Sequence, residues 1–387
     1  PPWERVKLQE KEWFAARDPE IAAAPNAAAR KKLIAALKSE NPDMYAQFLA
    51  DLRRAEGEST LLRNSGRYPL GGRGDVNTYP VFTELMRNAI APRGRVGVIV
   101  PTGIATDDTT KHLFGDLVER RSLVSLFDFE NRRGIFPGVH RSYKFSLLTL
   151  SGDDRPVDQA EFVFFAHEVS DVEDQTRRLT LSAEDFALLN PNTKTCPVFR
   201  TRRDAEITKS IYRRVPVLVK EGDPNGNPWG VKFSTMFHMS NDSHLFRTRE
   251  QLESDGWELQ GNCYVRNGET YLPLYEDWMV YHFDHRARSN GERETTPVQH
   301  GDPTFVVLPR YWVKYSDIES RVAGSTRRHL FPFRNRARNT DRRTFIGTCV
   351  PFGAAGNVVP LLNMETTNVP WMQAVTSSFA FDYVCRQ

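Results

Sequence analysis

The spacing of apolar residues predicts helices at the start of the chain. From residue 4 to about residue 60, apolar positions recur at helical intervals among Ala, Lys and Glu, as at Leu33 and Leu37. Asn41 followed by Pro42 is typical of a helix start, with the proline in the first turn. This part of the chain is therefore predicted to be a helical segment.

Three later stretches have the apolar runs expected of strands. They are Arg95–Pro101 (RVGVIVP), Leu123–Phe129 (LVSLFDF) and Phe145–Leu150 (FSLLTL). The first run is almost uninterrupted, which predicts a strand buried on both faces of a parallel sheet. A helical pattern containing Leu113 and Leu117 separates the first two runs. This alternation of strand and helix predicts an α/β layered fold.

The pattern changes after Ser151-Gly152-Asp153-Asp154, which predicts a domain boundary at 154/155. In residues 155–387, short strand-like runs alternate with Gly, Asn and Pro turns. Examples of these runs are Val231–Phe237, Tyr271–Leu274 and Phe305–Leu308. A mixed, strand-rich second domain is expected.

Composition narrows the class of protein. The 387 residues suffice for two domains, and no apolar run approaches the about 20 residues of a membrane span. The four cysteines are far apart and form no Cys-x-x-Cys pair, so a thiolate zinc site is not expected. A reducing, cytoplasmic location and no membrane partner are predicted. The net charge of +3 does not by itself indicate a nucleic-acid partner.

Several motifs occur in an informative order. Pro1-Pro2-Trp3 is followed by GRVGVIVPTGI (94–104) and LFDFENRRGIFPGVHRSYKFSLLTL (126–150). This order resembles the gamma-class adenine-N6 DNA methyltransferases, above all the large methylases of type IIG restriction–modification and phage-defence systems. The resemblance covers the first 150 residues best and extends more loosely to the end.

The resemblance implies a partial, Rossmann-like methyltransferase domain in residues 1–154, with a helical insertion at about 4–60. The half that binds S-adenosylmethionine, and an Asn preceding the two prolines, are expected upstream of Pro1. Residues 155–387 would be the target-recognition domain, and whether that domain is truncated stays open. Double-stranded DNA is the implied partner, and restriction or defence-system subunits are candidate partners.

The resemblance also implies a catalytic role for the first three residues. An exocyclic amine is a weak nucleophile, and two acceptors on its N–H bonds would free its lone pair. The carbonyl of Pro1 would be one acceptor, Pro2 would stiffen the loop, and Trp3 would stack on the target adenine. Because the base must leave the duplex, aromatic faces have to replace its lost stacking. Phe136 is similar to the family's second stacking residue, and Phe145 competes with it.

A basic segment in the second domain is the candidate DNA contact. Residues 310–343 hold ten Lys/Arg against three Asp/Glu, with aromatics between them. Arginine suits both phosphate oxygens and guanine edges, although a solvated basic face is the alternative interpretation. The arginines singled out are Arg310, Arg327, Arg328, Arg334, Arg336 and Arg338.

Two further patterns are interpreted as structural. Gly71-Gly72-Arg73-Gly74 lacks the features of a phosphate-binding loop and is expected to be a plain loop, with a DNA-backbone contact as the alternative. The histidines at 238, 244, 282 and 285 do not match a zinc motif, and no metal is predicted.

These observations predict a site-specific adenine-N6 DNA methyltransferase, with this chain alone inactive. Two alternatives remain: an inactive DNA-specificity module, and a methyltransferase for another amine such as cytosine N4 or a protein glutamine.

Overall fold

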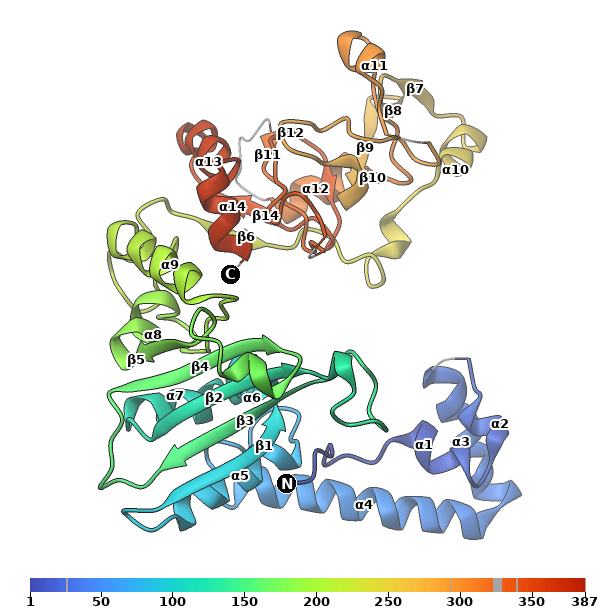
Figure 1. The fold of residues 1–387 in the computed structure, drawn as a ribbon. Coiled ribbons are helices and arrows are strands. Elements are labelled where there is room, and N and C mark those ends of the chain that lie inside the picture. The colour runs from blue at the N-terminus through green and yellow to red at the C-terminus, as the bar shows by residue number, and fades with distance from the viewer. Residues whose placement is uncertain (26, 293, 323–328, 339, 387) are drawn as a thin grey trace. The chain divides into compact units, whose positions relative to one another are not determined.

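In a computed structural model of the chain, a five-stranded sheet forms the centre of the first of two units, Pro1–Val217 (Figure 1). Its strands are β1 (Arg95–Pro101), β2 (Leu123–Glu130), β3 (Lys144–Ser151), β4 (Gln159–Ala166) and β5 (Leu179–Ser182). They lie in the order β1-β3-β2-β4-β5, and β1, β2 and β4 run opposite to β3 and β5. The structure describes residues 1–25, 27–292, 294–322, 329–338 and 340–386.

The three predicted strands exist, but the expected environment of the first one is wrong. β1 pairs antiparallel with β3, and its side chains alternate in exposure. Val98 and Val100 are buried, whereas Gly97 and Ile99 face solvent. The cause is that helices pack on only one face of the sheet, so the apolar run of β1 is half exposed.

Five helices cover that face. They are α5 (Thr78–Ala89), α6 (Gly103–Thr106), α7 (Lys111–Glu119), α8 (Ala183–Leu189) and α9 (Arg202–Arg214). Each contributes apolar side chains to one core with all five strands, including Phe114, Leu126, Phe162 and Phe186. Because β4, β5, α8 and α9 share this core, the structural boundary lies at Val217/Leu218, later than the predicted 154/155 boundary.

The predicted helical segment folds around a separate small core. Its helices are α1 (Glu10–Ala15), α2 (Pro19–Ala22), α3 (Ala27–Glu40) and α4 (Pro42–Asn64). Phe14, Ile34 and Phe48 are buried in this core. The helix start at Asn41 is confirmed, because its side chain accepts a hydrogen bond from the N–H of Met44 at 3.1 Å.

The second unit, Leu218–Gln387, is also mixed α/β but has short elements (Figure 1). Its strands are β6 (Lys232–Ser234), β7 (Glu258–Gln260), β8 (Cys263–Arg266), β9 (Glu269–Tyr275), β10 (Trp312–Lys314), β11 (His329–Leu330), β12 (Val350–Pro351), β13 (Ala354–Ala355) and β14 (Leu361–Asn363). Its helices are α10 (Arg249–Ser254), α11 (Pro297–Gly301), α12 (Tyr315–Arg321), α13 (Val369–Thr376) and α14 (Phe379–Arg386). The largest sheet has the order β10-β9-β8-β7, with β13 pairing in parallel with β9.

Two of the three strand predictions in this unit are confirmed, by β6 and β9. Phe305–Leu308 is not a strand. Its backbone carbonyls instead accept hydrogen bonds from a neighbouring loop. Arg286 donates to the carbonyl of Phe305, and the N–H of Asn290 donates to the carbonyl of Leu308. Among the described residues, no helix is both long and apolar enough to cross a lipid bilayer.

Candidate functional site

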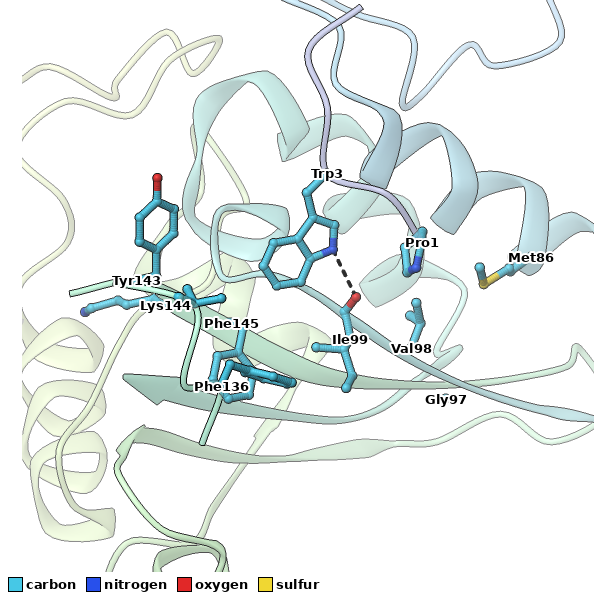
Figure 2. A pocket seen from close by; sticks show the side chains of 11 residues that line it. Pro1, Trp3, Met86, Gly97, Val98, Ile99, Phe136, Tyr143, Lys144 and Phe145 are labelled. Atoms are coloured by element: carbon cyan, nitrogen blue, oxygen red, sulfur yellow. Dashed lines mark hydrogen bonds between the residues drawn. The ribbon is translucent and has the colours of Figure 1, made fainter. Parts of the chain in front are cut away.

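Trp3 and Phe136 line one open pocket (Figure 2). Its volume is about 490 Å³, and its wall includes Pro1, Ile99 and Phe145. That volume lies within the range of about 300–1,000 Å³ that is usual for small-molecule sites. The pocket lies beside the edge strand β1, where Ile99 is exposed, and Met86 of α5 also lines it. The sequence-predicted aromatics, far apart along the chain, are therefore brought together beside Pro1.

Thr78 holds the segment that carries Trp3. Its hydroxyl donates to the carbonyl of Pro2 at 2.8 Å and accepts from the N–H of Glu4 at 2.9 Å. The indole N–H of Trp3 donates to the carbonyl of Ile99 on β1 at 3.3 Å (Figure 2). These contacts fix the ring of Trp3 at the pocket while Pro2 turns its carbonyl away to α5. Pro1 remains at the pocket wall.

Asn131 fixes the loop that carries Phe136. Asn131 starts the 3₁₀ turn η2 (Asn131–Arg133) and is fully buried. Its amide nitrogen donates to the carbonyls of Phe136 and Val139 at 2.9 and 2.8 Å, and its oxygen accepts from the N–H of Phe136 at 2.9 Å. One side chain therefore sets the backbone on both sides of Phe136. Phe136 is 38% exposed and lines the pocket.

Phe145, the competing aromatic, is a core residue that supports Phe136. It is 5% exposed and stacks on Phe129, with ring centroids 5.3 Å apart. The ring of Phe136 meets that of Phe145 edge-on at 5.0 Å. The buried ring of Phe145 therefore supports the exposed ring of Phe136 from below. This packing holds the ring of Phe136 in a fixed orientation.

A buried carboxyl group lies at the same end of the sheet. Asp128 on β2 is 1% exposed and accepts hydrogen bonds from the hydroxyl of Thr102 and from the N–H of Phe165, the latter at 3.1 Å. Burial raises the pKa of Asp128 despite these two donors. Asp128 thereby links the start of α6 to the end of β4, and it does not line the pocket.

Glu130 organises the cations near the pocket. Burial would raise its pKa, but hydrogen bonds from His167, Arg132 and Lys144 hold that pKa below the usual value. The distances are 2.7 Å to Arg132 and 3.3 Å to each of Lys144 and His167. Three basic side chains thus share one carboxylate at the end of the central strand β2, where Arg132 and Lys144 alone carry two positive charges against its one negative charge.

The glycine loop at residues 71–74 is closely packed. A Cβ at Gly71 would lie 2.7 Å from the carbonyl oxygen of Pro80, and one at Gly72 only 2.3 Å from that of Leu62. These glycines allow α4 and α5 to approach, and the space above them is filled by backbone. They do not form a cradle for S-adenosylmethionine, and the described residues show no other glycine-rich turn after a strand.

The structure describes four of the six candidate DNA-binding arginines and places them in different settings. Arg310 pairs with the nearly buried Glu276 at 2.7 Å, and Arg334 donates to the carbonyl of Val280 at 2.9 Å. Arg336 and Arg338 are exposed. Arg327 and Arg328 lie outside the described residues. Of the four described arginines, Arg336 and Arg338 are the more accessible.

The histidines of the second unit take part in local contacts. Nδ1 of His238 lies 3.3 Å from the N–H of Ser240, and His300 lies 3.5 Å from Asp284. Burial lowers the pKa of His282 and of His285. In the part of the chain that the structure describes, no three His, Cys, Asp or Glu side chains are grouped as metal ligands.

Sequence reasoning missed the residues that position the pocket. Asn131 follows a strand directly, and a polar residue at a strand end is a signal that could have identified it. Thr78 and Asp128 carried no such signal, because their roles depend on which distant backbone groups the fold brings to them. The sequence pattern did not single out Lys144, because this residue directly precedes the apolar run 145–150.

Comparison with known proteins gives limited similarity. No protein-family model and no curated protein matches the sequence. Among solved structures, the chain is similar to the type IIG restriction endonuclease BpuSI, with 10% identity and a TM-score of 0.32, over 84% of this chain and 41% of that one. It is also similar to the ATP-dependent type ISP restriction–modification enzyme LlaBIII bound to DNA, with 9% identity and a TM-score of 0.26, over 46% and 13%.

The chain spans less than half the length of either enzyme. At these TM-scores the similarity supplies no residue roles, so a function has to be argued from the pocket itself.

Proposed function

We propose that this chain is the base-binding and DNA-recognition part of a site-specific adenine-N6 DNA methyltransferase. The observation that carries the proposal is the meeting of Trp3, Phe136 and Pro1 at one open pocket. A flat purine extruded from a duplex needs aromatic faces to replace its stacking, each worth about 1–3 kcal/mol. The two exposed rings supply such faces.

The chain's own residues would act by holding the base rather than by reacting with it. Trp3, tied to β1 through its indole N–H, would present a fixed face. Phe136, set by Asn131 and supported by Phe145, would present a second one. With the amine positioned, one of its N–H groups would donate a hydrogen bond to the carbonyl oxygen of Pro1, as the resemblance implies. The lone pair of the amine is then less delocalised into the ring.

S-adenosylmethionine would supply the methyl group, and the described residues do not fit it. We propose that most of its binding site lies outside this chain. The second unit would read the DNA sequence, with Arg336 and Arg338 as its most accessible candidate contacts. The protein would act on DNA in the cytoplasm, within a restriction–modification or phage-defence system and with other subunits of that system as candidate partners.

The experiment that tests the proposal identifies the methyl mark. The full-length protein is expressed in a host that lacks adenine methylation, and nucleosides from digested DNA are separated by mass spectrometry. N6-methyldeoxyadenosine is the expected product, absent from the same host without the protein and reduced in an otherwise identical host that carries Trp3→Ala. N4-methyldeoxycytidine, or a methylated protein glutamine, would favour another amine as substrate. An unmodified host with duplex binding intact would favour a DNA-specificity module.

A further inference from the structure

A strained residue lies at the end of β4. Phe165 has a backbone φ of 56°, a left-handed conformation that is costly for a residue with a side chain. It sits in a bulge, because the register between β2 and β4 shifts from Phe127↔Val163 to Phe129↔Ala166. Bulges of this kind turn a side chain away from its regular direction.

The surrounding groups hold the bulge on both sides. The N–H of Phe165 donates to buried Asp128 at 3.1 Å, and its carbonyl accepts from Nη2 of Arg177 at 2.8 Å. Arg177 is itself fixed by an ion pair with Asp171 at 2.7 Å. Strain that is maintained by a buried carboxyl group and a paired guanidinium is a built feature of the fold.

The bulge places the ring of Phe165 against two cations from separate segments. Nζ of Lys144, on β3, lies 4.5 Å from the ring centroid, and Cζ of Arg200, which precedes α9, lies 4.4 Å from it. Both distances are suitable for cation–π attraction. One ring, near the end of the inner strand β4, thus gathers two positive charges.

The positive charges of Lys144 and Arg200 are not fully neutralised by neighbouring carboxylates, so the two side chains could bind a further anion. Arg200 is exposed and makes no ion pair among the described residues. Lys144 shares Glu130 with Arg132 and His167, so that carboxylate does not neutralise it alone. The stem of Lys144 also lines the aromatic pocket, and its ammonium group points away from Pro1 (Figure 2).

We propose that Lys144 and Arg200, gathered on the ring of Phe165, bind a backbone phosphate of DNA beside the nucleotide whose base enters the pocket. Lys144 belongs both to the lining of the aromatic pocket and to the pair of cations at Phe165. A nucleotide could occupy both places, because it consists of a flat base linked to a phosphate. Both cations are open to solvent, which suits a phosphate of a long polymer better than a small enclosed anion. The inference rests on the proposed function, since it takes DNA as the ligand.

Salt dependence of duplex binding tests the phosphate subsite. Fluorescence anisotropy of a labelled duplex is measured with the 387-residue chain at several salt concentrations. Removing one phosphate interaction lowers the slope of log affinity against log salt by about 0.9. Because both cations bind the same phosphate, the double variant Lys144→Gln/Arg200→Gln should lower the slope by about one, and each single variant by no more than that. Arg54→Gln on α4, which removes an exposed charge elsewhere, should keep the wild-type slope.

The outcomes separate this inference from the proposed function. A double variant with the wild-type slope would overturn the phosphate subsite while leaving DNA binding intact. A wild-type chain that binds no duplex would overturn both. A control whose slope falls as much as that of the two variants would show a diffuse charge effect and would also reject the subsite.

Phe165 provides a second test that does not depend on removing charge. Phe165→Gly removes the ring but tolerates the positive φ, so the fold should be retained. Lys144→Gln should then weaken binding less in the Phe165→Gly background than in wild type, because the two residues act through one interaction. Phe165→Tyr, which keeps a π face, should restore wild-type coupling. Equal effects of Lys144→Gln in all three backgrounds would reject the positioning role of Phe165.

Discussion

Asn131 is the residue on which the geometry of Phe136 depends most directly. In Asn131→Asp, a carboxylate would face the carbonyls of Phe136 and Val139, which now receive its amide N–H groups. Unsatisfied buried groups cost about 1–3 kcal/mol each, so single-turnover methyl transfer by the full-length protein should fall by at least about tenfold. Because protonation gives the new side chain a donor, lowering the pH should recover part of the rate.

The control for this change is Asn88→Asp, which alters an exposed side chain on α5. It should leave the rate and its pH profile close to wild type. If Asn131→Asp matches Asn88→Asp in both respects, Asn131 does not position Phe136.

Asp128 predicts a pH dependence of stability. Burial raises its pKa above the unfolded value, so the folded state holds the proton more tightly. The resulting stabilisation is present below the unfolded pKa and is lost as pH rises through the folded pKa. Asp128→Asn cannot titrate. The free energy of unfolding of wild type minus that of Asp128→Asn, from urea titrations, should therefore shrink as pH rises.

Replacing the same residue with alanine isolates the hydrogen bond to the bulge. Asp128→Ala leaves the N–H of Phe165 without its acceptor and should lower the free energy of unfolding by about 1–3 kcal/mol relative to Asp128→Asn. A difference between wild type and Asp128→Asn that stays constant with pH would show that Asp128 has an ordinary pKa.

At the scale of elements, the first six residues depend on the start of α5. Thr78→Val keeps the shape of the side chain but removes its bonds to Pro2 and Glu4. At about 0.5–1.5 kcal/mol per bond, methyl transfer should drop by about tenfold while the urea midpoint changes little. Thr109→Val, at an exposed site, should change neither quantity. A wild-type rate in Thr78→Val would mean that Trp3 is held by its own bond to Ile99.

The sequence predicts the elements of the first unit better than their assembly. Apolar runs identify β1, β2 and β3, because continuous hydrophobicity over strand length is a local signal. The apolar runs do not reveal that β1 is covered on one face only, because that coverage depends on where α5 and α7 pack. The turn at Gly152 looks like a linker, yet a Cβ there would lie 2.2 Å from the carbonyl oxygen of Ala91. It is a tight internal turn, and the sheet continues beyond it.

The sequence predicts the aromatic residues of the pocket but not the residues that hold them in place. Trp3 and Phe136 are identified by the order of motifs that resemble a known family. The hydrogen bonds of Asn131 and Thr78 require the final loop conformations, which no short pattern in the sequence encodes. The left-handed backbone of Phe165 is equally invisible, because phenylalanine gives no signal for a positive φ.

At the scale of the whole molecule, the arginines of the second unit have two roles. Arg310 pairs with a nearly buried carboxylate, whereas Arg336 and Arg338 are exposed. Replacing Arg336 and Arg338 together by Gln should lower the salt slope of duplex affinity by about one for each phosphate interaction removed. The free energy of unfolding should change by no more than about 0.5 kcal/mol, as is usual for exposed residues. Fluorescence anisotropy and urea titration of the 387-residue chain provide the two measurements.

Arg310→Gln is the matched comparison, because it leaves the nearly buried carboxylate of Glu276 without its cation. It should lower the free energy of unfolding by about 1–3 kcal/mol and change the salt slope little. The reverse pattern, with stability reduced at Arg336 and Arg338 and slope reduced at Arg310, would contradict the division.

The central claim is that the pocket of the first unit holds an extruded adenine against Trp3. Single-turnover methyl transfer by the full-length protein, compared between Trp3→Ala, Trp3→Phe and wild type, tests it most directly. Loss of one stacking face at about 1–3 kcal/mol predicts that Trp3→Ala is slower by about five- to two-hundredfold, whereas Trp3→Phe retains much of the rate. Equal rates for Trp3→Ala and wild type would contradict the account and make Trp3 a structural residue.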